Sequence, residues 1–321
     1  MKESLITVII PCYNAAEFVE NCLDSLSQQT FKNFDVIAVD DCSTDGTYEF
    51  LKKYQSKTEL RLAILNNEVN SGPASSREKA AEYASSEYLC FCDADDTYST
   101  DFLKQIGDAI KRNNPSLIIT GYTLVMKNGR KTVKFAKKNK YDVGKEKAFL
   151  SRVNSLWALA VRRNVFLSVK HPDIRNGEDM AVIPLMISQS ECIDILSNAS
   201  YQYNCRGGSA SRTSNMKVVE SLLVSFRHID SNLPLQYYDF AEFLAIKNVL
   251  YGCLLNLFKF SFNVRKAKEI ILEIEEKYPD WYKNKYFKSL PKQRQVFVFF
   301  IKHRLFFMLK LFSELHKFSI R

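Results

Sequence analysis

The fold class is decided by the stretch Tyr88-Leu89-Cys90-Phe91-Cys92-Asp93-Ala94-Asp95-Asp96. Its first half is an apolar run with the length of a buried strand, and its second half holds three aspartates. Three earlier cycles of the same kind precede it, each a β-rich run followed by a segment with helical spacing. The predicted strands span 5–10, 34–39 and 60–65, and the predicted helices span 18–26, 45–51 and 73–83. This alternation predicts an α/β fold with a mostly parallel central sheet flanked by helices.

The pattern continues beyond the aspartates and then changes. We predict a helix at 101–112, a strand at 117–122 and a hairpin turn at Lys127-Asn128-Gly129-Arg130. From about Met216 the chain is typical of helices rich in Phe, Tyr, Leu and Lys. The sequence therefore predicts an α/β domain over 1–215, with halves at 1–96 and 97–215, and a helical appendage over 216–321.

The composition is that of a globular protein, and it gives no sign of a disulfide-rich or membrane-spanning chain. The chain has 321 residues, of which 46% are hydrophobic and 25% are charged, and its net charge is +9. This is ordinary globular composition. The eight cysteines are not grouped as CxxC pairs, which favours reduced thiols over a disulfide framework or a zinc site. We expect neither a signal peptide nor a transmembrane helix, since no run of about 18 uncharged apolar residues occurs.

Polar clusters follow four of the predicted strands. Because right-handed crossovers bring the carboxyl ends of parallel strands to one edge of the sheet, these clusters converge on one crevice, where ligands of such sheets bind. Surface loops are often polar, which is the alternative explanation of the pattern. The clusters are Pro11–Asn14, Asp40–Thr47, Asn70–Arg77 and Asp93–Asp96.

The last cluster has the spacing of a cation site. Carboxylates two residues apart, just past a buried strand, can hold a hard divalent cation that keeps open positions for phosphate oxygens. Such a cation would neutralise a diphosphate and stabilise it as a leaving group. The alternative is the first turn of a helix, where an acidic side chain such as that of Asp96 favours the helix dipole.

Two further clusters carry candidate chemistry. The carboxylates after the second strand can accept hydrogen bonds from a base N–H or from ribose hydroxyls, although Asp45 fits a helix cap better. The segment Arg175–Asp179 places Asp179 after a glycine turn and before an apolar run. A carboxylate there can take a proton from a hydroxyl group, and a capped helix start is the alternative.

Taken in order, six segments resemble the family 2 glycosyltransferases of the GT-A fold, bacterial branch. The resemblance covers about residues 4–215, and the Q-x-x-R-W segment of processive members is absent, which favours single additions. The matching segments are Pro11-Cys12-Tyr13-Asn14, Val39–Thr47, Asn70-Ser71-Gly72 with Arg77, Asp93-Ala94-Asp95-Asp96, Gly177-Glu178-Asp179, and Tyr203 with Arg206, Gly208 and Ser209.

The resemblance implies a role for each matching position. Asp179 would be the catalytic base of an inverting transfer, with Glu178 supporting it. Asp95 would hold Mn²⁺ or Mg²⁺, assisted by Asp93 and Asp96. The nucleotide-sugar, a UDP-sugar by expectation, would be bound by Pro11, Tyr13, Asn14, Asp40, Asp41, Arg77, Asp93, Arg206 and Ser209. The 1–96 half would bind the nucleotide and the 97–215 half the acceptor.

Two positions depart from the pattern of the family. Glu78 follows Arg77 where the family more commonly has Asn. Val182 stands where the family often has an aromatic residue. Trp157 has two interpretations, a platform under the acceptor sugar or a core residue.

The tail over 292–321 is basic and aromatic. An amphipathic helix of this composition can lie in the headgroup region of anionic lipid. Packing against the rest of the chain or formation of a homodimer is the alternative. No recognition motif for nucleic acid accompanies the positive charge.

The resemblance, together with the tail, implies an enzyme that moves one hexose or N-acetylhexosamine to a glycan or lipid-linked acceptor in bacterial cell-surface polysaccharide synthesis. It would act in the cytoplasm, peripheral at the inner face of the membrane. Two rivals remain: a non-catalytic binding or scaffold protein of the same fold, and a nucleotidyltransferase.

Overall fold

The structure, a computed structural model, describes residues 4–134, 140–151, 153–172, 174, 177–205 and 215–319. The chain divides into two compact units, which are described separately. The first comprises Met1–Arg175 and Gln189–Gly207, and the second comprises Asn176–Ser188 and Gly208–Arg321. Residues 176–188, which the sequence placed in the α/β domain, are thus grouped with the helices of the second unit.

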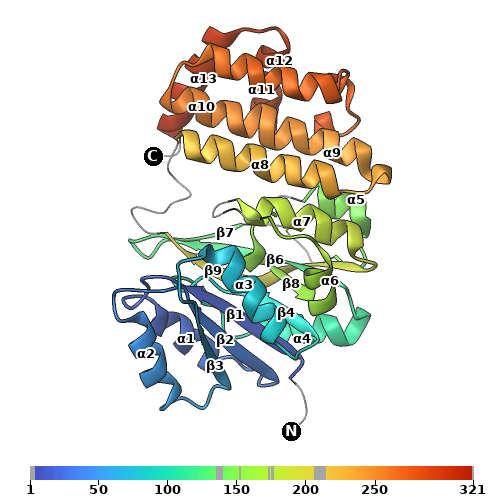
Figure 1. Cartoon of the computed structure of the whole chain (residues 1–321). Helices are drawn as coiled ribbons and strands as arrows, with labels where there is room; N and C mark the ends of the chain where they lie inside the picture. The colour runs from blue at the N-terminus through green and yellow to red at the C-terminus, as the bar shows by residue number, and fades with distance from the viewer. Residues whose placement is uncertain are drawn as a thin grey trace. The chain divides into compact units, whose positions relative to one another are not determined.

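The first unit is built on a mixed sheet, which has nine strands in the described ranges (Figure 1). Their order is β3-β2-β1-β4-β8-β6-β9-β5, and β7 pairs with β6. The first four strands are parallel neighbours, whereas β8 runs antiparallel to both β4 and β6. The strands are β1 (Ile6–Cys12), β2 (Phe34–Asp40), β3 (Leu62–Asn66), β4 (Tyr88–Phe91), β5 (Thr97–Tyr98), β6 (Leu117–Val125), β7 (Lys131–Lys134), β8 (Leu159–Arg162) and β9 (Ile193–Asn204).

Helices of this unit pack on the sheet through alternating strand residues. Ile6, Val8 and Ile10 of β1 are fully buried in one cluster with Leu23 and Ile106. Each such side chain stabilises the fold by roughly 1.5–3 kcal/mol when fully buried. The helices of the unit are α1 (Val19–Ser27), α2 (Thr47–Gln55), α3 (Gly72–Tyr83), α4 (Phe102–Asn113), α5 (Gly144–Phe149), the short η1 (Leu156–Ala158) and α6 (Arg163–Ser168).

The predicted elements of this unit are confirmed. The hairpin turn at 127–130 is an example. The turn between β6 and β7 contains Gly129 at φ +78°, which favours glycine. The amide of Met126 donates to the carbonyl of Arg130 at 2.9 Å across this turn. All eight cysteines are free, and most of them are buried.

The second unit is helical. Gly177, at φ +86°, precedes its first helix, and its carbonyl accepts a hydrogen bond from the Ser225 hydroxyl at 2.9 Å. The elements are α7 (Glu178–Gln189), α8 (Met216–Asn232), η3 (Leu235–Tyr237), α9 (Tyr238–Leu244), a π-helical stretch η4 (Ala245–Cys253), α10 (Leu254–Phe260), α11 (Val264–Lys277), η5 (Trp281–Lys283), η6 (Phe287–Ser289), α12 (Lys292–Lys302) and α13 (Phe306–Ser319).

One continuous helix of the second unit, Leu235–Phe260, is long and apolar enough to cross a membrane by length and composition. However, 72% of its most apolar window is buried inside the structure. Ile246, Val249 and Leu250 are fully buried. It is therefore a core helix around which the other helices of the unit pack.

Candidate functional site

Two loops at the carboxyl edge of the sheet are tied together by hydrogen bonds. The Asn14 side-chain oxygen accepts from the Thr44 amide at 2.9 Å, and the Asn14 amide donates to the Ser43 hydroxyl at 3.0 Å. Behind them, the Ala15 amide donates to the Thr47 hydroxyl at 2.8 Å. The two loops therefore form one surface, and Asn14 acts as the link between them.

Neighbouring positions on this surface differ in exposure. Tyr13 is exposed and Pro11 is half-buried. An exposed aromatic ring at a sheet edge is available for stacking against a planar ligand. Asp45 accepts hydrogen bonds from Ala16 and Thr47, which lower its pKa although burial acts in the opposite direction. Its carboxylate thus satisfies an amide at the start of α2, while Gly46 occupies the capping position itself.

Asp40 presents an unsatisfied acceptor at the end of β2. The side chain is only 2% exposed, and its Oδ2 accepts from the Ser43 amide at 3.2 Å. Its Oδ1 is buried and has no hydrogen-bond partner in the described part of the chain. Because buried polar atoms are nearly always paired, this oxygen has the capacity to accept one further hydrogen bond.

Asp41 is engaged within the protein. Its Oδ1 accepts from the Asn67 amide group and from the Ser71 backbone, and its Oδ2 accepts from the Gly72 backbone at 2.7 Å. These bonds hold the start of α3 against the end of β2. The resemblance implied that Asp41 contacts the nucleoside, but with both oxygens occupied, a positioning role fits the geometry better.

We predict different effects from changing these two aspartates. Asp41→Ala should lower the free energy of unfolding by about 3 kcal/mol, because two buried donors and one partly buried donor lose their acceptor. Asp40→Asn should leave stability nearly unchanged and weaken nucleotide binding, because only one bond within the protein is at stake. Urea denaturation and calorimetric titration with UDP measure the two quantities. Equal stability of the two variants would contradict this division of roles.

Arg77 connects α3 to the end of β4. It is 4% exposed, and its guanidinium donates to the Asp93 carboxylate at 2.8 Å. Removing Asp93 would take a close counterion away from this largely buried guanidinium, which is costly, whereas the Asp93 side chain itself is 31% exposed. Arg77 therefore fixes the orientation of Asp93. The resemblance implied contact with the base or ribose instead.

Asp96 is the most buried of the three aspartates after β4. Its Oδ2 accepts from the Tyr201 hydroxyl and its Oδ1 from the Asn204 amide, both at 2.7 Å. Burial, together with the nearby charge of Asp93, raises the pKa of Asp96 to about 7, while these two hydrogen bonds act in the opposite direction. Asp96 thus ties the end of β9 to the acidic loop, and both of its oxygens are already used.

The three aspartates form a group that can hold a metal ion. One carboxylate oxygen from each of Asp93, Asp95 and Asp96 lies within 4.8 Å of the others. This donor set of hard oxygens suits Mg²⁺ or Mn²⁺. Within this group Asp96 is held by β9 and Asp93 by Arg77, while the side chain of Asp95 is half-exposed.

Asp95 is reachable from solvent. It lines an open cavity of about 550 Å³ together with Asn21 and Asp24 of α1, Gln28 just after α1, and Gln202 of β9. The backbone carbonyl of Asp95 accepts from the Asn204 side chain at 2.9 Å, so the loop is held while its side chain stays half-exposed. A cation or phosphate can therefore approach this carboxylate without a rearrangement of the core.

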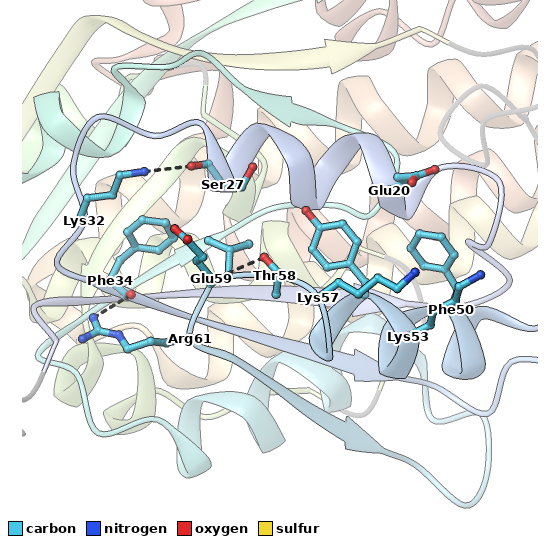
Figure 2. Close-up of a pocket in the computed structure, with 12 residues that line it drawn as sticks. Glu20, Ser27, Lys32, Phe34, Phe50, Lys53, Lys57, Thr58, Glu59 and Arg61 are labelled. Carbon is cyan, nitrogen blue, oxygen red and sulfur yellow. Dashed lines mark hydrogen bonds between the residues drawn. The ribbon is translucent and has the colours of Figure 1, made fainter.

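A larger cavity, of about 860 Å³, lies elsewhere on the first unit (Figure 2). It is lined by α1, α2 and the segments around Phe34 and Arg61, which lie at the amino ends of β2 and β3. Two of its cations are already used, since Lys32 donates to the Ser27 carbonyl and Arg61 to the Phe34 carbonyl. It lies at the opposite end of these strands from the polar loops and is not part of the candidate site.

Trp157 belongs to an aromatic group beside the acidic loop. Its ring stacks on Tyr201 at 4.4 Å between centroids and meets Tyr122 edge-on at 5.0 Å. The side chain is half-buried and packs against the hydrophobic core. One face of the Trp157 ring thus has a structural role. Through its stacking contact, Trp157 also supports Tyr201, whose hydroxyl donates a hydrogen bond to Asp96.

The candidate base lies in the second unit. Glu178 and Asp179 occupy the first turn of α7, where the helix dipole stabilises negative charge. Glu178 is buried and Asp179 is half-buried. Arg206 and Ser209, the other predicted donor-site residues, lie outside the described residues.

Three residues of the site were missed by the sequence. Asn67 positions Asp41, while Tyr201 and Asn204 hold Asp96. Tyr201 and Asn204 lie more than a hundred positions after the acidic loop, and no local pattern links them to it. The alternation of aromatic and polar residues over 201–204 at the end of β9 is a signal that the sequence analysis did not use.

Comparison with known proteins gives a consistent result. The model of the family Glycosyl transferase family 2 matches residues 7–167. The putative teichuronic acid biosynthesis glycosyltransferase TuaG of Bacillus subtilis is 31% identical over 177 residues, which cover 55% of this chain and 69% of TuaG. The poly(ribitol-phosphate) beta-N-acetylglucosaminyltransferase TarS of Staphylococcus aureus is 35% identical over 116 residues, which cover 35% of this chain and 20% of TarS.

A solved structure supports the fold over nearly the whole chain. The crystal structure of S. aureus TarS 1-349 in complex with UDP-GlcNAc matches with a TM-score of 0.65 at 21% identity. The match covers 98% of this chain and 92% of that one. With the sheet and its acidic loop, these matches define a nucleotide-sugar-type α/β fold with a helical C-terminal region, as the sequence predicted. The chain belongs to glycosyl transferase family 2 and is a glycosyltransferase.

Proposed function

We propose that this glycosyltransferase moves a single hexose or N-acetylhexosamine from a UDP-sugar to a glycan or lipid-linked acceptor, with inversion and with the help of a divalent cation. The observation that carries the proposal is the pairing of an unsatisfied buried acceptor, Asp40 Oδ1, with an acidic group on the same sheet edge. The Asp40 oxygen suits a hydrogen bond from a nucleoside, and the acidic group suits a diphosphate with its cation.

On the donor side, each residue has a defined task. Asp40 accepts a hydrogen bond from the base or the ribose, and the exposed ring of Tyr13 lies beside the base. Asp41 and Arg77 keep the binding surface in place by holding α3 and Asp93. Asp95 and Asp93 hold the Mn²⁺ or Mg²⁺ ion, and Asp96 orders their loop. When bound, the cation neutralises the diphosphate and stabilises it as a leaving group.

On the acceptor side, Asp179 is the proposed base and Glu178 supports it. Asp179 takes the proton of the acceptor hydroxyl, whose oxygen forms the new bond to the anomeric carbon. The bond between that carbon and the diphosphate oxygen breaks at the same time, and UDP departs. Attack from the face opposite UDP inverts the configuration.

The names of relatives support the proposed substrates and setting. TarS is named for transfer of N-acetylglucosamine to poly(ribitol-phosphate). A relative from Escherichia coli, 29% identical over 128 residues that cover 40% of this chain and 49% of the relative, is named for transfer of glucose to a diphosphoundecaprenol-linked sugar. We propose a related place in cell-surface polysaccharide synthesis, in the cytoplasm at the inner face of the membrane.

Release of UDP from a panel of UDP-sugars tests the proposal. We expect metal-dependent release with one donor, first by slow hydrolysis and faster once an acceptor glycan is added, and we expect EDTA to abolish it. A folded protein that binds UDP but releases none from any sugar, with or without acceptors, would favour the binding or scaffold alternative. Membership of the glycosyltransferase family already weighs against a nucleotidyltransferase.

A further inference from the structure

The segment near the C-terminal end of the chain is strongly basic. Residues 281–319 hold nine lysines and arginines and one acidic residue. Several of these cations pair with acids, such as Lys285 with Asp239. Lys292 and Lys302 form no ion pair among the described residues, and Lys302 lies 3.7 Å above the Tyr282 ring.

Exposed apolar side chains gather in the same segment, around the turn that joins α12 to α13. Phe299 is 52% exposed and Phe307 is 73% exposed. We call the following residues the corner patch: Val296, Phe299, Leu305, Phe307, Met308 and Leu311. With a rise of about 1.5 Å per residue, all of them lie within roughly 10 Å of the turn at 303–305 along their helices.

The corner patch is separate from the packing surface of its helices. On α12, Phe297, Val298 and Ile301 are buried, and on α13 Leu309 is buried. The ring of Phe297 meets the ring of Phe312 at 5.1 Å between the two helices. Each helix therefore has one apolar face inside the unit and further large apolar side chains in solvent, and single exposed residues do not explain such clustering.

We propose that the α12–α13 corner docks on a bilayer that contains anionic lipid, with the corner patch in the headgroup region and Lys292 and Lys302 against the lipid phosphates. Apolar burial and attraction to negative lipid act together in such contacts. Charge decides between the possible occupants. Several cations of this segment are paired with acids, but Lys292 and Lys302 form no ion pair among the described residues, and an interface between two copies would bring these like charges together. The corner patch would bring the proposed enzyme to a lipid-linked acceptor, and this purpose of the membrane contact rests on the proposed function.

The contact is peripheral. Among the described residues, the helix with the length and hydropathy of a membrane span is the core helix Leu235–Phe260, most of which is buried. A corner that lies in the interface needs no opening of this core.

Sedimentation of the full chain with vesicles tests the proposal. We expect binding to phosphatidylcholine vesicles that contain about a third phosphatidylglycerol, and much weaker binding to phosphatidylcholine alone. The double variant Phe299→Ser/Phe307→Ser should bind at least about tenfold more weakly, since the apolar contact is lost. Lys292→Gln/Lys302→Gln should weaken binding and reduce its dependence on salt. Leu235→Ser, a matched change at an apolar residue that is 89% exposed elsewhere in the unit, should have no effect.

Three outcomes would overturn the proposal: no binding to anionic vesicles, equal binding by the Phe299→Ser/Phe307→Ser variant, or a soluble dimer that this variant dissociates. The last result, seen by sedimentation velocity, would make a second copy the occupant. Circular dichroism checks that the variants are folded. UDP binding is measured on the same samples without vesicles, so failure of the donor site and failure of the membrane contact are seen separately.

Discussion

Asp179→Asn should reduce sugar transfer by at least about a hundredfold while leaving the affinity for UDP unchanged. An asparagine of the same shape cannot take the proton of the acceptor hydroxyl, and general-base catalysis typically contributes 10²–10⁴-fold. In the proposed donor site, UDP is bound instead by the loops at the ends of β1, β2 and β4, and this change alters none of their residues. Product formation with a glycan acceptor and titration calorimetry with UDP measure the two effects.

The matched control is Asp108→Asn, which changes an exposed carboxylate of α4 that pairs with Lys104. It should keep full activity. Transfer by Asp179→Asn at more than a tenth of the normal rate would remove Asp179 as the base. Loss of UDP binding in this variant would instead indicate that α7 shapes the donor site.

Asp95→Ala should differ from Asp179→Asn, because it should lose cation-dependent UDP binding as well as sugar transfer. A metal ion stabilises the charge of the transition state by several kcal/mol, and each 1.4 kcal/mol is a factor of ten in rate. We therefore expect transfer to fall by at least about a hundredfold at saturating Mn²⁺. Kinetic assays across a range of Mn²⁺ concentrations measure this loss.

Asp24→Ala serves as the control for that change. Asp24 lines the same open cavity as Asp95, but it is not in the acidic group and accepts a hydrogen bond from Tyr54. It should keep the wild-type dependence on Mn²⁺. If Asp95→Ala keeps that dependence as well, the cation is held elsewhere and the assignment of the acidic group fails.

The strand ends of the first unit could be predicted because their signals are local. An apolar run followed at once by aspartates, as at Asp40 and Asp93, marks both a buried strand and the edge where ligands bind. The hairpin turn at Gly129 is likewise a short-range signal. These features need no knowledge of distant parts of the chain.

The division of labour within the acidic clusters could not be predicted in this way. Asp40 and Asp41 are adjacent, yet one keeps an unsatisfied oxygen and the other holds the start of α3. Likewise, Asp96 is distinguished from Asp95 by Tyr201 and Asn204, more than a hundred residues away. Only the packing of β9 beside β5 brings those partners to the loop.

The second half of the first unit was harder to anticipate for the same reason. The run over 157–166 has no clear period, and it forms the short strand β8 and the helix α6. Because β8 pairs antiparallel with β4, the sheet is mixed rather than simply continued. The direction of such a strand depends on the path of the preceding chain, which composition does not encode.

The central claim, a cation-assisted UDP site at the carboxyl edge of the sheet, is tested most directly by thermal unfolding with UDP. A ligand that binds only the folded protein raises the midpoint of unfolding. We predict that UDP raises the midpoint of the wild-type protein in the presence of Mn²⁺ but not in EDTA, and that it has no effect on Asp95→Ala under either condition. An equal rise in the wild type and in Asp95→Ala, or no rise with any divalent cation, would contradict the account.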